Sequence, residues 1–236
     1  MKTVGILGGM GPRATVQFEQ MLVERFEGSD QTIAPIISIN DGRIPDRSTF
    51  LMGKGPDPVP ALQHNLDKLI LIGAEIIALP CNSACMPRIF NRLTSTATLL
   101  SLPQLVVSYI EKARFKKVCL LATDGTTQSH YYQKLCREVG SRCVTLPFST
   151  QTTLSSLIAT IKDGRINDAR RMAITIKEEI AILGCDGVIL GCTELSLVAN
   201  DITPSAAQAI DSLAILANAC VEYSKGEDYA KRFIYS

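Results

Sequence analysis

The sequence contains an internal repeat, and this repeat restricts the chain to folds built from two similar units. Residues 73–82 (GAEIIALPCN) align without a gap with residues 184–193 (GCDGVILGCT), at a constant offset of 111. A glycine, an acid, a short apolar run and a cysteine coincide in the two copies. Residues 2–7 (KTVGIL) also match residues 116–121 (KKVCLL), at an offset of 114. One structural unit is therefore expected to occur twice.

Short apolar runs alternate with helical patterns along the chain. Strands are predicted at 3–7, 35–39, 76–79, 117–122, 143–148 and 187–190, and helices at 16–26, 61–72, 129–139 and 168–183, with a long loop at 44–60. This rhythm is typical of α/β proteins. We predict two pseudosymmetric, mainly parallel-sheet α/β domains, with the active site in the cleft between them. The first covers 1–103 plus 208–236, with a final helix from about Ala206, and the second covers 104–207.

Charge and apolar patterning exclude several classes of protein. Lys and Arg total 24 against 23 Asp and Glu, so the chain has almost no net charge. It therefore has no overall positive potential that would attract nucleic acid or an anionic membrane. The most apolar later stretch, residues 69–79, contains Glu75 and is too short to span a bilayer. The first residues lack the apolar core of a signal peptide, so we expect a cytoplasmic protein. Eight cysteines spread through a large chain indicate reduced thiols rather than a disulfide framework.

Each copy of the repeat has a cysteine where a predicted parallel strand ends, and this is the edge at which open α/β sheets bind ligands. These residues are Cys81 and Cys192. The following residues, Asn82-Ser83 and Thr193-Glu194, favour helix starts, whose N–H groups lower a thiol pKa and bind carboxylates. The alternative is that both cysteines are buried packing residues. Glu194 is either a first-turn acid that suits the helix dipole or a group that orients Cys192.

Two thiols facing one carbon suit racemisation, in which one removes a proton and the other returns a proton to the opposite face. One cysteine must then be thiolate while the other is thiol, and the pair titrates together. Because an α-proton is very weakly acidic, the developing carbanion needs hydrogen-bond donors. Asn82, Ser83 and Thr193 follow the cysteines directly and are candidates for this role.

Four segments together resemble the cofactor-independent aspartate/glutamate racemase superfamily, and most closely its aspartate racemase branch. They are GILGGMGPRAT at 5–15, IPDRS at 44–48, LPCNSAC at 79–85 and LGCTELSL at 190–197. The resemblance spans nearly the whole chain. It implies that the protein interconverts L- and D-aspartate as a homodimer, with Cys81 and Cys192 catalytic. It also implies that neither pyridoxal phosphate nor a metal takes part.

The same resemblance assigns substrate contacts. Arg47 is expected to pair with the side-chain carboxylate of the substrate, and Lys162 to supply a second cationic contact. The remaining pocket contacts are expected to be Met10, Ser83, Thr123 and Thr193. The sequence departs from the family pattern at Cys85, where the family usually has histidine. This change affects the expected rate and pH dependence more than the reaction type.

Other interpretations remain open at this point. The motifs favour aspartate as the substrate, and another dicarboxylate such as glutamate is the alternative. A nicotinamide-dependent dehydrogenase fits the G-x-G-x-x-A pattern at 9–14, although Asp41 lies 32 residues after Gly9 rather than about 20. A two-lobed binding protein explains the repeat but not the two thiols. A CxxxC metal or redox site at Cys81 and Cys85 lacks a second ligand pair.

The remaining cysteines and the two histidines have no such placement. Surface or helix-capping roles are expected for His64 and His130. Packing or incidental positions are expected for Cys119, Cys136, Cys143, Cys185 and Cys220.

Overall fold

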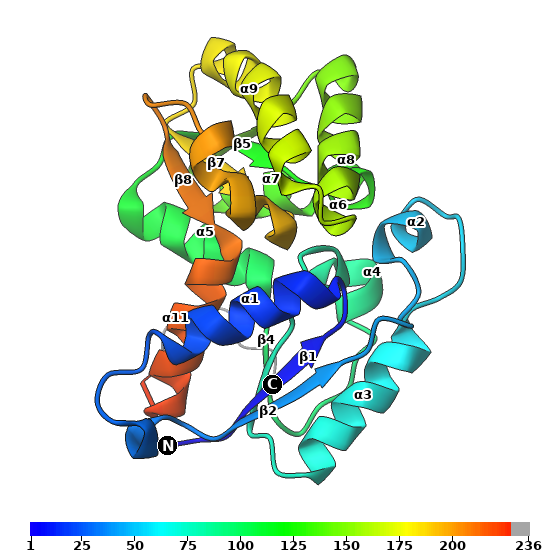
Figure 1. Cartoon of the computed structure of the whole chain (residues 1–236), viewed down its shortest axis with the longest axis vertical. Helices are drawn as coiled ribbons and strands as arrows, with labels where there is room; N and C mark the ends of the chain where they lie inside the picture. The colour runs from blue at the N-terminus through cyan, green and yellow to red at the C-terminus, as the bar shows by residue number, and fades with distance from the viewer. Residues whose placement is uncertain (228–236) are drawn as a thin grey trace. The chain divides into compact units, whose positions relative to one another are not determined.

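The computed structural model describes residues 1–227, which divide into two compact units (Figure 1). The first unit comprises residues 1–105 and the described residues from Leu213 onward, and the second comprises residues 106–212. Within the described residues, each unit contains one four-stranded parallel sheet.

The sheet of the first unit, sheet A, has the strand order β2-β1-β3-β4. Its strands are β1 (Val4–Gly8), β2 (Ile36–Asn40), β3 (Ile76–Ala78) and β4 (Thr98–Leu100). Every residue of β1 and β3 is buried, as expected for central strands covered on both faces, whereas the edge strand β2 is partly exposed. In register, Val4 lies opposite both Ile36 and Ile76.

The sheet of the second unit, sheet B, repeats this topology with the strand order β6-β5-β7-β8. Its strands are β5 (Lys117–Leu121), β6 (Arg142–Thr145), β7 (Gly187–Leu190) and β8 (Gln208–Asp211). In each sheet the first, second and third strands along the chain occupy equivalent positions, and all the pairs are parallel. The repeat in the sequence is thus a repeat in the structure, and the predicted α/β fold with two parallel sheets is confirmed.

Helices connect these strands. The bounds are α1 (Pro12–Val23), α2 (Arg47–Leu51), α3 (Val59–Leu71), α4 (Pro87–Phe90), α5 (Leu102–Ala113), α6 (Asp124–Gln128), α7 (Tyr131–Glu138), α8 (Phe148–Lys162), α9 (Ile166–Leu183), α10 (Ala199–Ile202) and α11 (Ser212–Ser224). Short 3-10 helices are η1 (Asp30–Thr32), η2 (Ser83–Cys85) and η3 (Thr193–Val198). In the described residues, no helix is both long enough and apolar enough to cross a membrane.

Helices α8 and α9 lie side by side in the second unit and cover sheet B (Figure 1). Helix α8 was not predicted, because its sequence is rich in Ser and Thr. It forms nevertheless, since Leu154, Leu157, Ile158 and Ile161 recur at helical spacing and all enter the core cluster of the unit. Full burial of each such side chain contributes roughly 1.5–3 kcal/mol, which outweighs the weak helix propensity of Ser and Thr.

Two further expectations about local structure were wrong. The final helix begins at Ser212 rather than near Ala206, because residues 208–211 form strand β8 beside β7. This strand is held in register by Gln208 N–H, which donates to the Asp186 carbonyl, and by the fully buried Ile210. The predicted loop at 44–60 contains α2, whose start is capped by the Asp46 carboxylate accepting from Thr49 N–H at 2.7 Å.

The turn after β1 depends on a glycine with little space around it. Gly9 has φ +96°, and a Cβ there would lie 2.2 Å from the Asp41 carbonyl oxygen. Gly73 has a similar φ of +100°, but a Cβ there would meet nothing within 4 Å. Substitutions at both positions carry the strain of a positive φ, but only a substitution at Gly9 adds a steric clash. Comparing them therefore separates the two costs.

Replacing Gly9 by alanine is expected to lower the free energy of unfolding by about 3 kcal/mol or more, because strain and backbone displacement add. Gly73→Ala is the matched control, with an expected cost of about 1–2 kcal/mol from backbone strain alone. Urea unfolding of both variants measures the difference. Equal stability of the two variants would show that the turn accommodates a side chain.

Candidate active site

In the first unit, the candidate site residues lie beyond the carboxyl ends of β1 and β3. These strands are parallel neighbours with Ile6 opposite Ala78, so the residues that follow them leave the sheet at the same edge. Met10 follows β1 and is 3% exposed, and Cys81 follows β3 and is 6% exposed. A tight turn sets the position of Cys81, whose N–H donates to the Leu79 carbonyl at 2.7 Å. The next residue, Asn82, is also buried.

The predicted helix starts after the two cysteines are 3-10 helices rather than α-helices. Asn82 precedes η2, which is three residues long, and its side chain makes no capping hydrogen bond. Pro87 explains the early end of η2, because the residue before a proline is excluded from the helical region, and Met86 has ψ 143°. Cys192 precedes η3 and its carbonyl accepts from Leu195 N–H at 2.9 Å. The prediction that the two thiols lie at the N-termini of α-helices was therefore wrong. Each thiol lies at a tight turn before a short 3-10 helix.

In the second unit, the candidate site residues lie around Cys192, beyond the carboxyl end of β7. Cys192 is 6% exposed, and its thiol donates to Glu194 Oε2 at 3.0 Å. The Thr193 hydroxyl donates to the same oxygen at 3.3 Å. Glu194 is 3% exposed, and among the described residues its Oε1 has no hydrogen-bond partner. A buried carboxylate aimed at the cysteine favours the interpretation that Glu194 orients Cys192 over a simple role at the helix dipole.

Arg47 lies at the start of α2 and is buried, although it comes from a segment predicted as a loop. Its guanidinium donates to three backbone carbonyls: Ile44 at 3.0 Å, Pro45 at 2.9 Å and Met10 at 2.9 Å. The structure thus brings Arg47 to the turn after β1. A guanidinium has five N–H donors, and Arg47 Nε has no partner among the described residues. Donors therefore remain for a carboxylate.

Thr123 and Lys162 belong to the second unit. Strands β5 and β7 pair with Leu121 opposite Leu190, so Thr123 and Cys192 follow neighbouring strand ends. The Thr123 hydroxyl bonds to that of Thr126 at 3.2 Å. Lys162 is the exposed last residue of α8. Thr123 therefore lies at the edge of sheet B that holds Cys192, whereas Lys162 lies at the carboxyl end of α8.

Cys85 is separated from the reactive positions by burial. It is 1% exposed in η2, and Leu102 N–H at the start of α5 donates to its sulfur. Burial strongly raises the pKa of the Cys85 thiol, and the neighbouring Cys81 raises it further. Cys85 is thus held as a neutral thiol. Within the described part of the chain, no group of three or more His, Cys, Asp or Glu residues is arranged to hold a metal ion.

Asp41, the acid of the dehydrogenase alternative, is already engaged. Its carboxylate accepts from Arg43 Nε at 2.8 Å and from Asn65 Nδ2 at 3.2 Å. These bonds, the one from Arg43 first, hold the pKa of Asp41 well below its usual range. The glycine turn is instead fastened by Thr15, whose hydroxyl accepts from Gly9 N–H at 3.0 Å and donates to the Gly11 carbonyl at 3.1 Å. Thr15 was not predicted as a site residue, although it stands in the GPRAT motif.

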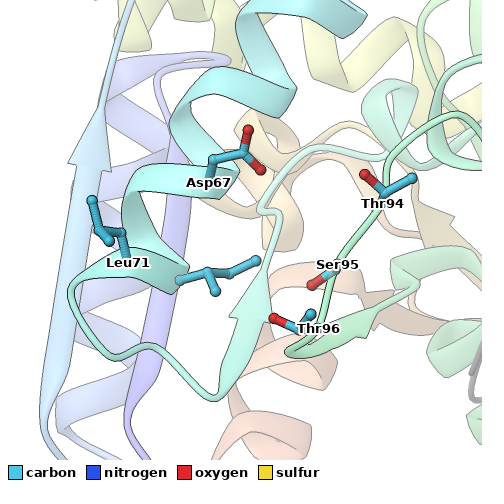
Figure 2. Close-up of a pocket in the computed structure, with 6 residues that line it drawn as sticks. Asp67, Leu71, Thr94, Ser95 and Thr96 are labelled. Carbon is cyan, nitrogen blue, oxygen red and sulfur yellow. The ribbon is translucent and has the colours of Figure 1, made fainter.

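A cavity of about 460 Å³ lies elsewhere in the first unit, between the end of α3 and the segment before β4 (Figure 2). Asp67 and Leu71 line it from α3, opposite Thr94, Ser95 and Thr96. Because α3 ends and β4 begins there, this cavity lies at the amino-terminal edge of sheet A, away from the strand ends that hold Met10 and Cys81. Asp67 is the titratable group among its lining residues, so the cavity offers no acid–base pair.

Comparison with known proteins agrees with this geometry. The Asp/Glu/Hydantoin racemase family model matches residues 7–220. A Picrophilus torridus aspartate racemase structure is 30% identical, with a TM-score of 0.84 over 95% of both chains. The broad specificity amino-acid racemase RacX of Bacillus subtilis is 28% identical over 92% of this chain and 96% of its own length.

A more distant structure shares the fold. Glutamate racemase from Francisella tularensis, in complex with D-glutamate, is 16% identical, with a TM-score of 0.70 over 98% of this chain and 84% of its own. The family assignment also disfavours the dehydrogenase and binding-protein alternatives. With two parallel sheets of the same order and a buried cysteine beyond equivalent strands, the chain belongs to the Asp/Glu/Hydantoin racemase family of amino-acid isomerases.

Proposed function

We propose that this protein interconverts L- and D-aspartate without pyridoxal phosphate, using Cys81 and Cys192 as a thiolate and thiol pair. The observation that carries the proposal is the equivalence of the two cysteines. Each follows the third strand along its sheet and each is 6% exposed. A 3-10 helix begins two residues after Cys81 and one residue after Cys192. The mechanism requires both thiols to reach one substrate molecule from opposite faces of the α-carbon.

The proposed reaction moves one proton off the α-carbon and another onto it. The thiolate of one cysteine takes the α-proton and becomes a thiol, and the electron pair of the broken C–H bond moves into the carboxylate as a planar enolate. The thiol of the other cysteine then donates its proton to the opposite face and becomes the thiolate. Because the α-proton is a very weak acid, hydrogen-bond donors around the carboxylate must stabilise the enolate. Asn82 and Ser83 are the proposed donors beside Cys81. The backbone N–H of Thr193 is the proposed donor beside Cys192, because the Thr193 hydroxyl already donates to Glu194.

The preference for aspartate rests on Arg47 and on the similarity to the aspartate racemase structure from Picrophilus torridus. A guanidinium binds a carboxylate through two parallel N–H bonds, and Arg47 keeps its Nε–H uncommitted. The protein of Picrophilus torridus is an aspartate racemase, whereas RacX is a broad specificity amino-acid racemase. The substrate assay therefore includes acidic amino acids and an amino acid without a side-chain carboxylate.

Incubation of the purified protein with L-aspartate, with no added cofactor, tests the proposal. We expect the optical activity to decay to zero as D-aspartate accumulates, with L-glutamate and L-alanine converted at least about tenfold more slowly, a difference of about 1.4 kcal/mol in barrier. Faster conversion of glutamate or alanine would contradict the aspartate assignment. Conversion only after addition of pyridoxal phosphate would contradict the thiol mechanism.

Glu194→Gln tests the proposed positioning of Cys192. Glutamine keeps the size of the side chain but replaces the charged carboxylate, which accepts a hydrogen bond from the Cys192 thiol, with a neutral amide. We therefore expect kcat to fall about 10- to 100-fold. KM should stay within about twofold, because Glu194 is not proposed to touch the substrate. Steady-state kinetics in both directions measure this. Glu178→Gln on the exposed face of α9 is the matched control, and equal kinetics in the two variants would remove the role of Glu194.

A further inference from the structure

In the second unit, the turn after β5 is tied to helix α8 by the side chain of Gln151. Its amide nitrogen, Nε2, donates to the Ala122 carbonyl at 3.0 Å and to Asp124 Oδ1 at 2.9 Å. These two acceptors lie on either side of Thr123, the residue predicted to contact the substrate. Ser155, one turn further along α8, donates its hydroxyl to the same Asp124 oxygen at 3.0 Å. Helix α8 therefore holds both chain neighbours of Thr123.

The two hydrogen bonds fix the orientation of the Gln151 amide. The side chain is 9% exposed, and both of its N–H groups are used. Turning the amide over would place its Oε1 against two oxygen acceptors, so only one orientation satisfies both bonds. Among the described residues, Oε1 has no hydrogen-bond partner, and an unpaired buried acceptor opposes folding. The contribution of Gln151 at this buried position therefore lies in its two N–H donors.

Gln151 has the same place in its unit as Arg47 has in the first. Arg47 lies at the start of the helix after β2 and donates to the Met10 carbonyl in the turn after β1. Gln151 lies near the start of α8, the helix after β6, and donates into the turn after β5. At the offset of 114 that relates the first strands of the two units, Asp124 is the counterpart of Met10. A neutral amide thus stands in the second unit where the first has a guanidinium.

The turn that carries Thr123 needs support from outside itself. Thr123 precedes α6, which has only five residues, and its carbonyl accepts from Thr127 N–H at 2.9 Å. So short a helix is not stable alone. Helix α8 is well placed to support this turn, because it also contacts η3, the 3-10 helix that follows Cys192. The bonds from Gln151 thus connect the turn to a helix that packs beside the proposed catalytic thiol.

We propose that Gln151 is a positioning residue, which holds Thr123 where its hydroxyl meets the substrate. This inference rests on the proposed racemase function, which places Thr123 in the substrate pocket. Gln151 acts through the turn and does not itself need to touch the substrate. A displacement of about 1 Å in a substrate contact can lower a rate by about 10²-fold, so loss of this support should be measurable in kcat/KM.

Gln151→Glu tests this role without changing the size of the side chain. Both N–H donors are lost, and at neutral pH a carboxylate is brought against the Ala122 carbonyl and the Asp124 carboxylate. We expect kcat/KM for aspartate to fall at least about tenfold. Gln151→Ala removes the donors without adding a charge, and a loss of at least about tenfold is expected there too. Unchanged kcat/KM in folded Gln151→Glu would overturn the proposal.

A double-mutant cycle shows whether Gln151 acts through Thr123. Thr123→Val removes the hydroxyl and keeps the branched shape of the side chain. If Gln151 serves to place that hydroxyl, Gln151→Ala should cost at least about tenfold in the unsubstituted protein but less than about twofold in Thr123→Val. A purely structural role would cost the same in both backgrounds. Equal losses of kcat/KM would therefore overturn the proposal.

Ser155→Ala and Ser156→Ala form a matched pair of milder variants on α8. The Ser155 hydroxyl shares Asp124 Oδ1 with Gln151, whereas the Ser156 hydroxyl donates to the Thr152 carbonyl of its own helix at 3.1 Å. Ser155→Ala should lower kcat/KM for aspartate about two- to threefold, and Ser156→Ala should leave it unchanged. Equal kinetics in the two variants would contradict the anchoring of Asp124 on α8.

Hydrogen exchange separates this proposal from the proposed function, because it requires no turnover. The amides of residues 122–127 should exchange at least about tenfold faster in Gln151→Ala than in the unsubstituted protein, while those of β7 keep their protection. Unchanged exchange in the turn would overturn the role of Gln151 even in an active racemase. An unsubstituted protein that racemises no amino acid would instead overturn the proposed function, and faster exchange would still support the anchoring of the turn by Gln151.

Discussion

Replacing either Cys81 or Cys192 by alanine is expected to lower the rate of aspartate racemisation by at least about 10³-fold. General acid and general base each contribute typically 10²- to 10⁴-fold, and each cysteine plays both roles, one in each direction of the reaction. The loss should therefore appear with L-aspartate and with D-aspartate alike. Each thiol is buried beyond a strand end, so the smaller alanine side chain should leave sheet A and sheet B intact.

Cys220→Ala is the matched control for these variants. Cys220 is fully buried in α11, and burial raises the pKa of its thiol. Its replacement removes the same atoms from the interior without removing a proposed acid or base, so some stability but little activity should be lost. Circular dichroism and chiral chromatography on all three variants give folding and rate together. Full racemisation by folded Cys81→Ala or Cys192→Ala would exclude the paired-thiol mechanism.

Replacing Arg47 by alanine is expected to lower kcat/KM for aspartate by about 10²- to 10³-fold, about 2.7–4 kcal/mol. Two effects contribute. The substrate loses the proposed bidentate partner of its side-chain carboxylate, and the carbonyl of Met10 loses the donor that fixes the turn after β1. Arg47→Lys should recover only part of the activity, since an ammonium cannot reproduce the planar fork that serves Ile44, Pro45 and Met10 together.

Substrate preference separates the two effects of Arg47. Loss of the turn geometry should slow every amino acid, whereas loss of carboxylate binding should slow aspartate more than alanine. We therefore expect the ratio of kcat/KM for aspartate over alanine to fall by at least about tenfold in Arg47→Ala. Arg43→Ala is the control, because Arg43 is largely exposed and pairs with Asp41. An unchanged ratio in Arg47→Ala would leave Arg47 a structural role only.

Much of the fold could be predicted because both copies of the repeat contain the short apolar run that a buried strand of a parallel sheet requires. The apolar runs before Cys81 and Cys192 become the buried strands β3 and β7, and the offset between them reappears as the same strand order in both sheets. Strand β8 was missed because its sequence, QAID, is not an apolar run like those of β3 and β7. Pairing with β7, rather than its own periodicity, defines it.

The candidate site was predictable to a smaller extent. Residues adjacent to the cysteines could be placed because the chain itself carries them, so Asn82, Thr193 and Glu194 share the environment of the neighbouring thiol. The family resemblance predicted that Arg47 belongs to the site. Its hydrogen bond to the Met10 carbonyl could not be predicted, because it depends on the short helix α2, and the Pro- and Gly-rich sequence of this segment indicates a loop. Lys162 stays a prediction, as do the homodimer and the cytoplasmic location.

The most direct test of the paired-thiol mechanism is the isotope content of both enantiomers at early times in deuterated water. With two bases, a proton leaves one face to one thiol and a solvent-derived deuteron enters the other face from the second thiol. Starting from L-aspartate, the D-aspartate formed in the first few per cent of reaction should carry one α-deuterium, and the remaining L-aspartate should carry almost none. Rapid deuteration of L-aspartate ahead of inversion, or D-aspartate that retains the original proton, would contradict the account.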